Sequence, residues 1–106
     1  MPSADDQALE LEHVLQQTVA ILQKHGEGHW QSRLQEALAL ITKRDIRGLE
    51  ALQSMYGGMG SLTDVFLHPA NGHQIRENEV DSVNGALRTL CGRICGLVSQ
   101  LLRNSC

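Results

Sequence analysis

The stretch of sequence that decides the fold is residues 79–103, EVDSVNGALRTLCGRICGLVSQLLR. Its apolar residues recur every three or four positions, which is the spacing of one face of an α-helix. This apolar stripe consists of Val80, Val83, Leu87, Leu90, Cys91, Ile94, Leu97, Val98 and Leu101. The pattern predicts one long amphipathic helix, which we expect to be the spine of the fold.

The same segment carries a second stripe of small residues, which consists of Gly85, Gly92, Gly96 and Ser99. Successive helical residues advance by about 100°, so these four fall within about 100° of one another around the axis. Each interior glycine costs about 1 kcal/mol of helix stability relative to alanine, so three in one helix need a reason. Close approach of a second helix is the natural reason, and that helix can belong to the same domain or to a second chain. We therefore treat the four residues as a candidate interface.

Two helices are predicted in the first half of the chain. Residues 4–25 have a helical apolar period, with Ser3 as a cap and Gly26 as a stop. Residues 29–43 have a second apolar stripe in which Trp30 is the largest anchor. The connection between them is short, which favours antiparallel neighbours.

A third helix is expected to begin after Asp45 as its cap and to end at Gly57. We regard Gly48 as its weak point, because glycine is a poor helix former. A glycine-rich break follows, and its residues are Gly57, Gly58, Met59, Gly60 and Ser61, with Asp64 three residues further on.

We interpret this break as a structural corner. Gly57 or Gly58 can close the preceding helix at positive φ, and Met59 can fill the core. Ser61 can cap the next element, with Asp64 completing a capping box. Residues 62–68 are too few for periodicity to decide between helical turns and an extended piece. Residues 69–78 form the longest predicted loop.

Together these segments predict an all-α fold. We expect a small antiparallel bundle of about four main helices, with a short element after the glycine-rich corner. Because 106 residues is the length of one typical domain, we expect residues 1–106 to form a single helical domain.

The pattern over residues 29–67 resembles an uncharacterised family of small bacterial helical proteins marked by a GGMGS-x-x-D signature. The residues that carry the resemblance are Trp30, Ala37-Leu38-Ala39-Leu40-Ile41, Asp45, Gly48-Leu49, Leu52 and Tyr56 through Asp64. The resemblance implies a bacterial, cytoplasmic domain with one shared structural element. The family has no established activity, so the resemblance transfers no functional residue.

Composition narrows the classes of partner. The formal net charge is -3 and 20% of residues are charged, which argues against nucleic-acid binding and against attraction to anionic membranes. The longest apolar run, residues 37–41, is far too short to span a membrane, and we expect a cytoplasmic protein. Cys91, Cys95 and Cys106 are expected to be buried and reduced, since four-residue helical spacing does not suit a disulfide.

Candidate reactive groups are scattered. His25, His29, His68 and His73 could in principle surround a metal ion, but the first two straddle a predicted helix break, so we predict no metal site. The glycine-rich corner has no nearby basic residue, which disfavours phosphate binding. No nucleophile with an adjacent base is evident.

We therefore expect a non-enzymatic protein without a cofactor. Recognition of another protein, or of a second copy of the chain, is the favoured role, for instance as an immunity or antitoxin-like partner. The alternative is a small-ligand or metal-binding protein that uses the glycine-rich corner or the histidines.

Overall fold

The computed structural model describes residues 3–56 and 61–104. Within these ranges the α-helices are α1 (Ala4–Lys24), α2 (Gly28–Thr42), α3 (Ile46–Ser54) and α4 (Val80–Asn104). Short 3-10 turns, η1 (Leu62–Asp64), η2 (Pro69–Asn71) and η3 (Glu77–Glu79), connect α3 to α4. The described residues form no strand, and the predicted all-α fold is confirmed.

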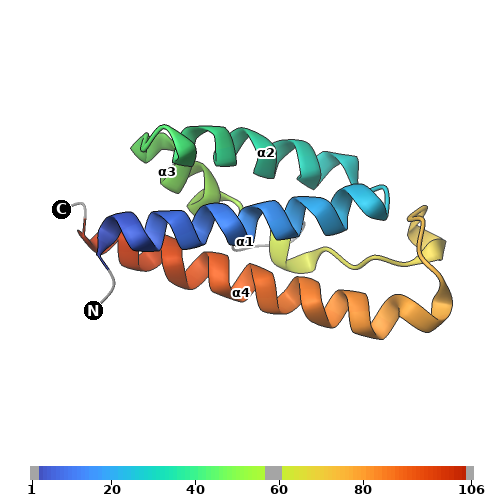
Figure 1. Ribbon diagram of the computed structural model, residues 1–106. Helices are drawn as coiled ribbons and strands as arrows, with labels where there is room; N and C mark the ends of the chain where they lie inside the picture. The colour runs from blue at the N-terminus through green and yellow to red at the C-terminus, as the bar shows by residue number, and fades with distance from the viewer. Residues whose placement is uncertain (1–2, 57–60, 105–106) are drawn as a thin grey trace.

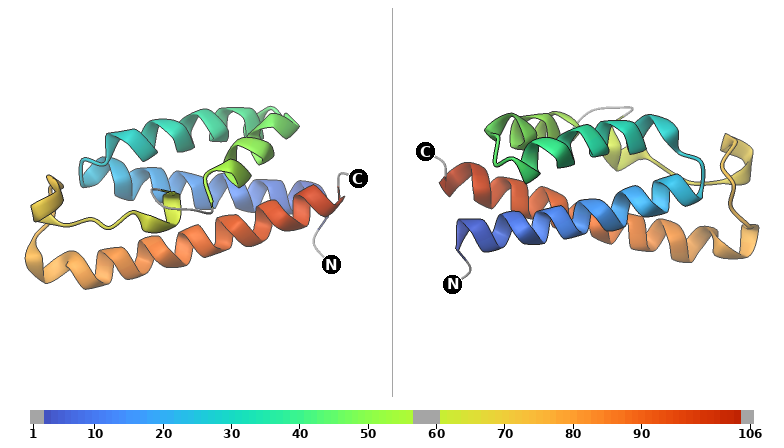
Figure 2. Two further views of the ribbon diagram at one scale, coloured as in Figure 1. Left: turned by 180° about the vertical axis from the view of Figure 1, so that it is seen from behind. Right: turned by 45° about the horizontal axis from the view of Figure 1, so that its top comes forward.

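The helix α1 is the centre of the bundle. It lies against both α2 and α4 and runs antiparallel to each (Figure 1). The shorter α3 packs against α2 and α4, and the connection from η1 to η3 runs along α4 (Figure 2). None of the helices in residues 3–56 and 61–104 combines the length and the apolar character needed to cross a bilayer.

The core contains the stripe predicted on α4. Most of its members are buried, while Val83 and Leu90 are partly buried and pack against the core. The same core cluster includes the fully buried Leu11, Leu15, Leu22, Leu34 and Leu52. Burying a side chain of this size stabilises a fold by about 1.5–3 kcal/mol, so this face of α4 holds the bundle together.

The helix ends largely follow the sequence signals. The Ser3 hydroxyl accepts a hydrogen bond from the backbone N–H of Asp6, and Gly26 ends α1 at φ +77°. Asp45 caps α3 by accepting from the backbone N–H of Arg47. The cap of α2 was not predicted: its first residue is Gly28, and the Glu27 carboxylate accepts from the backbone N–H of Trp30.

One expectation for α3 was wrong, and Gly48 has a packing role that was not predicted. The helix ends at Ser54 rather than at Gly57. Gly48 is buried, and a β-carbon there would lie 2.9 Å from Ile41 Cδ1 and 3.0 Å from Leu40 Cβ. The absence of a side chain at Gly48 therefore allows α3 to approach α2 closely.

The glycine-rich corner is described only at its end, because Gly57, Gly58, Met59 and Gly60 lie outside the described residues. Ser61 does not cap η1 with its side chain, so that half of the expected capping box was wrong. Its hydroxyl lies 2.7 Å from Thr63 Oγ1 instead. A single 3-10 turn followed by extended backbone at Val65 and His68 combines the two alternatives for residues 62–68.

Candidate functional site

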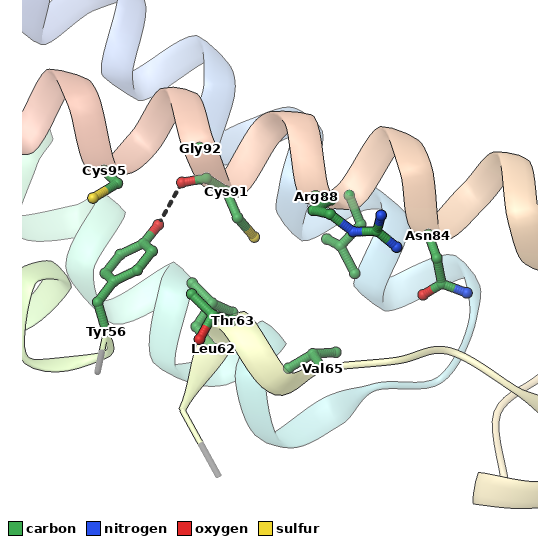
Figure 3. Close-up of a pocket in the computed structure, with 10 residues that line it drawn as sticks. Tyr56, Leu62, Thr63, Val65, Asn84, Arg88, Cys91, Gly92 and Cys95 are labelled. Atoms are coloured by element: carbon green, nitrogen blue, oxygen red, sulfur yellow. Dashed lines mark hydrogen bonds between the residues drawn. The ribbon is translucent and has the colours of Figure 1, made fainter. Parts of the chain in front are cut away.

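A pocket of about 310 Å³ opens between α4 and the segment that carries η1 (Figure 3). We call it the α4 pocket. Its apolar walls come from Leu62, Val65 and Leu87, and Tyr56 and Cys95 lie toward one end. Its volume is at the small end of the range for ligand pockets, about 300–1,000 Å³. The pocket therefore has room for one small chemical group but not for a cofactor-sized molecule.

Asn84 lies at the opposite end of the α4 pocket and is buried. Its Oδ1 accepts from the backbone N–H of Leu67 at 2.8 Å, and its Nδ2 donates to the carbonyls of Leu67 and Val80, also at 2.8 Å. Both amide protons are therefore used inside the protein. The role of Asn84 is to hold the extended segment after η1 against α4.

Tyr56 and Cys91 form a second fixed contact beside the pocket. The Tyr56 hydroxyl donates a hydrogen bond of 2.7 Å to the carbonyl of Cys91, which fixes the ring (Figure 3). Burial raises the pKa of Tyr56 above its usual range and raises the pKa of the Cys91 thiol to about 11. At neutral pH both groups stay protonated, so Cys91 is a poor nucleophile.

The two described cysteines are both free, as expected for their spacing. Cys91 is buried, but Cys95 is exposed, so the expectation of burial was wrong for Cys95. The two residues are four positions apart on α4 and differ by only about 40° around its axis, so Cys95 lies at the edge of the buried face. Cys106 lies outside the described residues.

Arg88 is the cation of the α4 pocket, and it is exposed. Figure 3 shows it on α4 between Cys91 and Asn84. It makes no hydrogen bond or ion pair with any other residue in the described part of the chain. Arg93, one turn further along, instead pairs with Glu10 of α1 at 3.0 Å.

The small-residue face of α4, formed by Gly85, Gly92, Gly96 and Ser99, points away from the core. Gly85 is partly exposed and the other three are exposed. A β-carbon built at any of the three glycines has no neighbouring atom within 4 Å among the described residues. The intramolecular alternative for this stripe was therefore wrong within the described structure, since none of the other described helices approaches these glycines closely.

Three of the candidate histidines lie where the turn between α1 and α2 touches the loop after Val65. We call this contact the polar junction, and it consists of His25, Glu27, His73 and Gln74. The His25 ring Nδ1 donates to the Gln74 carbonyl at 2.7 Å, and the Gln74 N–H donates to the His25 carbonyl at 2.9 Å. His73 Nε2 lies 3.0 Å from Glu27 Oε1. No feature of the sequence indicates that these two segments meet.

The hydrogen bonds of the polar junction fix the state of its side chains. His73 Nδ1 accepts from the His68 N–H at 3.1 Å, so the ring proton must lie on Nε2 and point at Glu27. Desolvation raises the pKa of Glu27, but the hydrogen bonds from His73 and the Trp30 N–H outweigh it and lower that pKa. Glu27 is thus held as a carboxylate.

The other two histidines of the candidate set also make local contacts. His68 Nδ1 accepts from the Ala70 N–H at 3.0 Å, and His29 packs edge-on against Trp30. Among the described residues, no three His, Cys, Asp or Glu side chains are grouped so that they could hold a metal ion. The arrangement brings His25, His68 and His73 into one region as structural groups.

Comparison with protein families gives one match. Residues 23–76, just over half of the chain, match a domain of unknown function (DUF6966). The chain belongs to this family. The segment that resembles an uncharacterised family, residues 29–67, falls inside the DUF6966 match. No curated protein and no solved structure matches the chain.

The DUF6966 match covers the polar junction completely but the α4 pocket only in part. It contains the whole polar junction, from His25 to Gln74. It contains one wall of the α4 pocket, at Tyr56, Leu62 and Val65, but it ends before α4 begins. Arg88 and the small-residue face are therefore features of the chain outside the matched segment.

Proposed function

We propose that this chain is a non-enzymatic protein-interaction module that binds its partner through the small-residue face of α4 and the adjoining α4 pocket. The observation that carries the proposal is the exposure of Gly92 and Gly96 with no described atom near their missing side chains. Each glycine costs helix stability, and the described fold gains no close contact in return. A second backbone from outside the chain is the remaining use for such a surface.

The chemistry of the α4 pocket supports the non-enzymatic part of the proposal. The Cys91 thiol and the Tyr56 phenol remain protonated at neutral pH, and the amide of Asn84 is used in structural hydrogen bonds. A catalytic set needs a nucleophile or base in a reactive state near a group that stabilises charge. Among the described lining residues Arg88 carries the only charge, and the second thiol, Cys95, has no histidine or carboxylate beside it in that lining to act as a base.

The partner is another protein or a second copy of this chain. A small bacterial, cytoplasmic protein of this kind fits a role such as immunity or antitoxin function, in which a compact module covers part of a larger protein. The net charge of -3 supports a protein partner over a nucleic acid.

The test is purification of the tagged protein from its own host cells, in parent form and as two variants. Gly96→Arg places a bulky charge on the small-residue face, and Gln35→Arg places the same charge on the exposed side of α2 as a matched control. We expect the parent and the control to retain one partner, or to give the mass of a dimer by light scattering, and Gly96→Arg to lose it. Equal retention by all three proteins, or a monomer without a partner in each case, would overturn the proposal.

A further inference from the structure

The α4 pocket pairs apolar walls with one positive charge. Arg88 is the single charged residue among its described lining residues, so no carboxylate within that lining neutralises it. The chain as a whole is acidic, with a net charge of -3, so this local positive charge does not follow from the composition. A guanidinium beside apolar walls complements a ligand that has an apolar body and an anionic group.

We infer that the α4 pocket binds an apolar side chain of the partner protein, and that a carboxylate on the same or the next residue of the partner pairs with Arg88. This inference rests on the proposed function. The occupant is a protein segment because Gly92 belongs both to the pocket lining and to the small-residue face. A partner backbone that lies along Gly92 and Gly96 can place one of its side chains in the pocket. A free small molecule would fill the pocket without covering the small-residue face.

The inference can be tested with minimal probes of known structure. N-acetyl-leucine carries a leucine side chain and a carboxylate, N-acetyl-leucinamide carries the same side chain without the charge, and N-acetylglycine carries the charge without the side chain. Each is titrated into the full chain labelled with ¹⁵N, and the backbone signals of Tyr56, Leu87 and Gly92 report on the pocket. Octanoate is titrated as a fourth probe, because it carries the same chemistry without a peptide group.

We expect N-acetyl-leucine to shift the signals of the pocket and to bind about two- to fivefold more tightly than its amide, the range that an exposed ion pair supports. N-acetylglycine should bind more weakly than both. Equal affinities of the acid and the amide, or shifts confined to other parts of the molecule, would overturn the inference. Octanoate binding more tightly than N-acetyl-leucine would assign the pocket to a free fatty-acid-like ligand and would also overturn it.

Variants at one position separate the charge from the fold. Arg88→Gln should remove the preference for the acid, while Arg88→Lys should keep part of it. Arg103→Gln removes the same charge from another exposed position on α4 and should change nothing. Because Arg88 makes no hydrogen bond or ion pair with another described residue, its variants should have the melting temperature of the parent. A preference for the acid that survives in Arg88→Gln contradicts the inference.

The two proposals fail in different experiments. If the partner is lost from Gly96→Arg but the acid and the amide bind equally, the small-residue face is an interface and only the role of the pocket is wrong. If the probes behave as expected but Gly96→Arg associates like the parent, the proposed function is wrong.

Discussion

The polar junction and the small-residue face of α4 lie in the same small bundle, yet they differ in how the fold accounts for them. At the junction, His25, Glu27 and His73 each have a hydrogen-bond partner within the chain. On α4, the glycines have no described neighbour and Arg88 has no described partner. Contacts within the fold therefore account for the side chains of the polar junction. No described contact within the chain accounts for the glycines and Arg88 on α4, so we look for their role in binding a partner.

The largest effect is expected where α4 does serve the fold. Asn84→Leu removes the partners of the buried N–H and carbonyl of Leu67, and each unsatisfied buried group costs about 1–3 kcal/mol. We expect the free energy of unfolding to fall by about 2–4 kcal/mol in urea denaturation. Thr89→Ala, at an exposed position on the same helix, is the control and should stay near the parent. A small effect of Asn84→Leu would mean that the segment after η1 is not held by this side chain.

Gly48 provides the internal contrast to the glycines of α4. In Gly48→Ala the new methyl carbon would lie closer to Ile41 and Leu40 than ordinary van der Waals contact. Overpacking of this kind lowers the free energy of unfolding by about 1–3 kcal/mol. We expect a lower melting temperature that does not depend on protein concentration. If Gly48→Ala melts with the parent, then α3 can move away from α2 without cost and the close approach is not required.

The polar junction predicts a dependence on pH. The pKa of Glu27 is lowered in the folded state, so its contribution to stability is complete above the ordinary value of 4.5 and is lost as the pH falls through the lowered value. We expect Glu27→Gln to lower the free energy of unfolding by about 1 kcal/mol at pH 7. The difference from the parent should shrink in denaturation curves recorded below pH 4.5. A difference that is constant with pH would show that the charge of Glu27 is irrelevant.

Gly96→Ala is expected to change the free energy of unfolding in the opposite direction from Gly48→Ala. Alanine is the better helix former, and its methyl group meets no described atom at this position. We expect the free energy of unfolding of the monomer to rise by about 0.5–1 kcal/mol, measured in the same urea denaturation as Gly48→Ala. A loss of stability would reveal a contact inside the chain and would remove the argument for an external one.

The sequence was sufficient for the features that depend on local chemistry. The apolar period of residues 79–103, the cap at Ser3 and the stop at Gly26 all predicted helices that the structure contains. It was insufficient where distant segments meet. The contact of Glu27 with His73 joins residues 46 positions apart, and the role of Gly48 depends on the position of Ile41 in another helix.

The same limit applies to the candidate site. The small-residue stripe was visible from its spacing, but its direction relative to the core could not be predicted because the neighbouring helices decide which side of α4 stays open. The α4 pocket escaped prediction because it combines Tyr56, Leu62 and Arg88 from three separate segments. A single arginine in a helical sequence does not indicate a binding site until the residues around it in the fold are known.

Gly96→Leu tests the central claim most directly, when its stability and its association are measured on the same samples. If the small-residue face is an interface, the variant should unfold at a free energy close to that of the parent monomer, while light scattering or co-purification shows that the dimer or the partner is lost. A variant that is destabilised by 1–3 kcal/mol, about the cost of overpacking a core, with its association unchanged would contradict the account. That result would place the glycines of α4 in the packing of the chain itself.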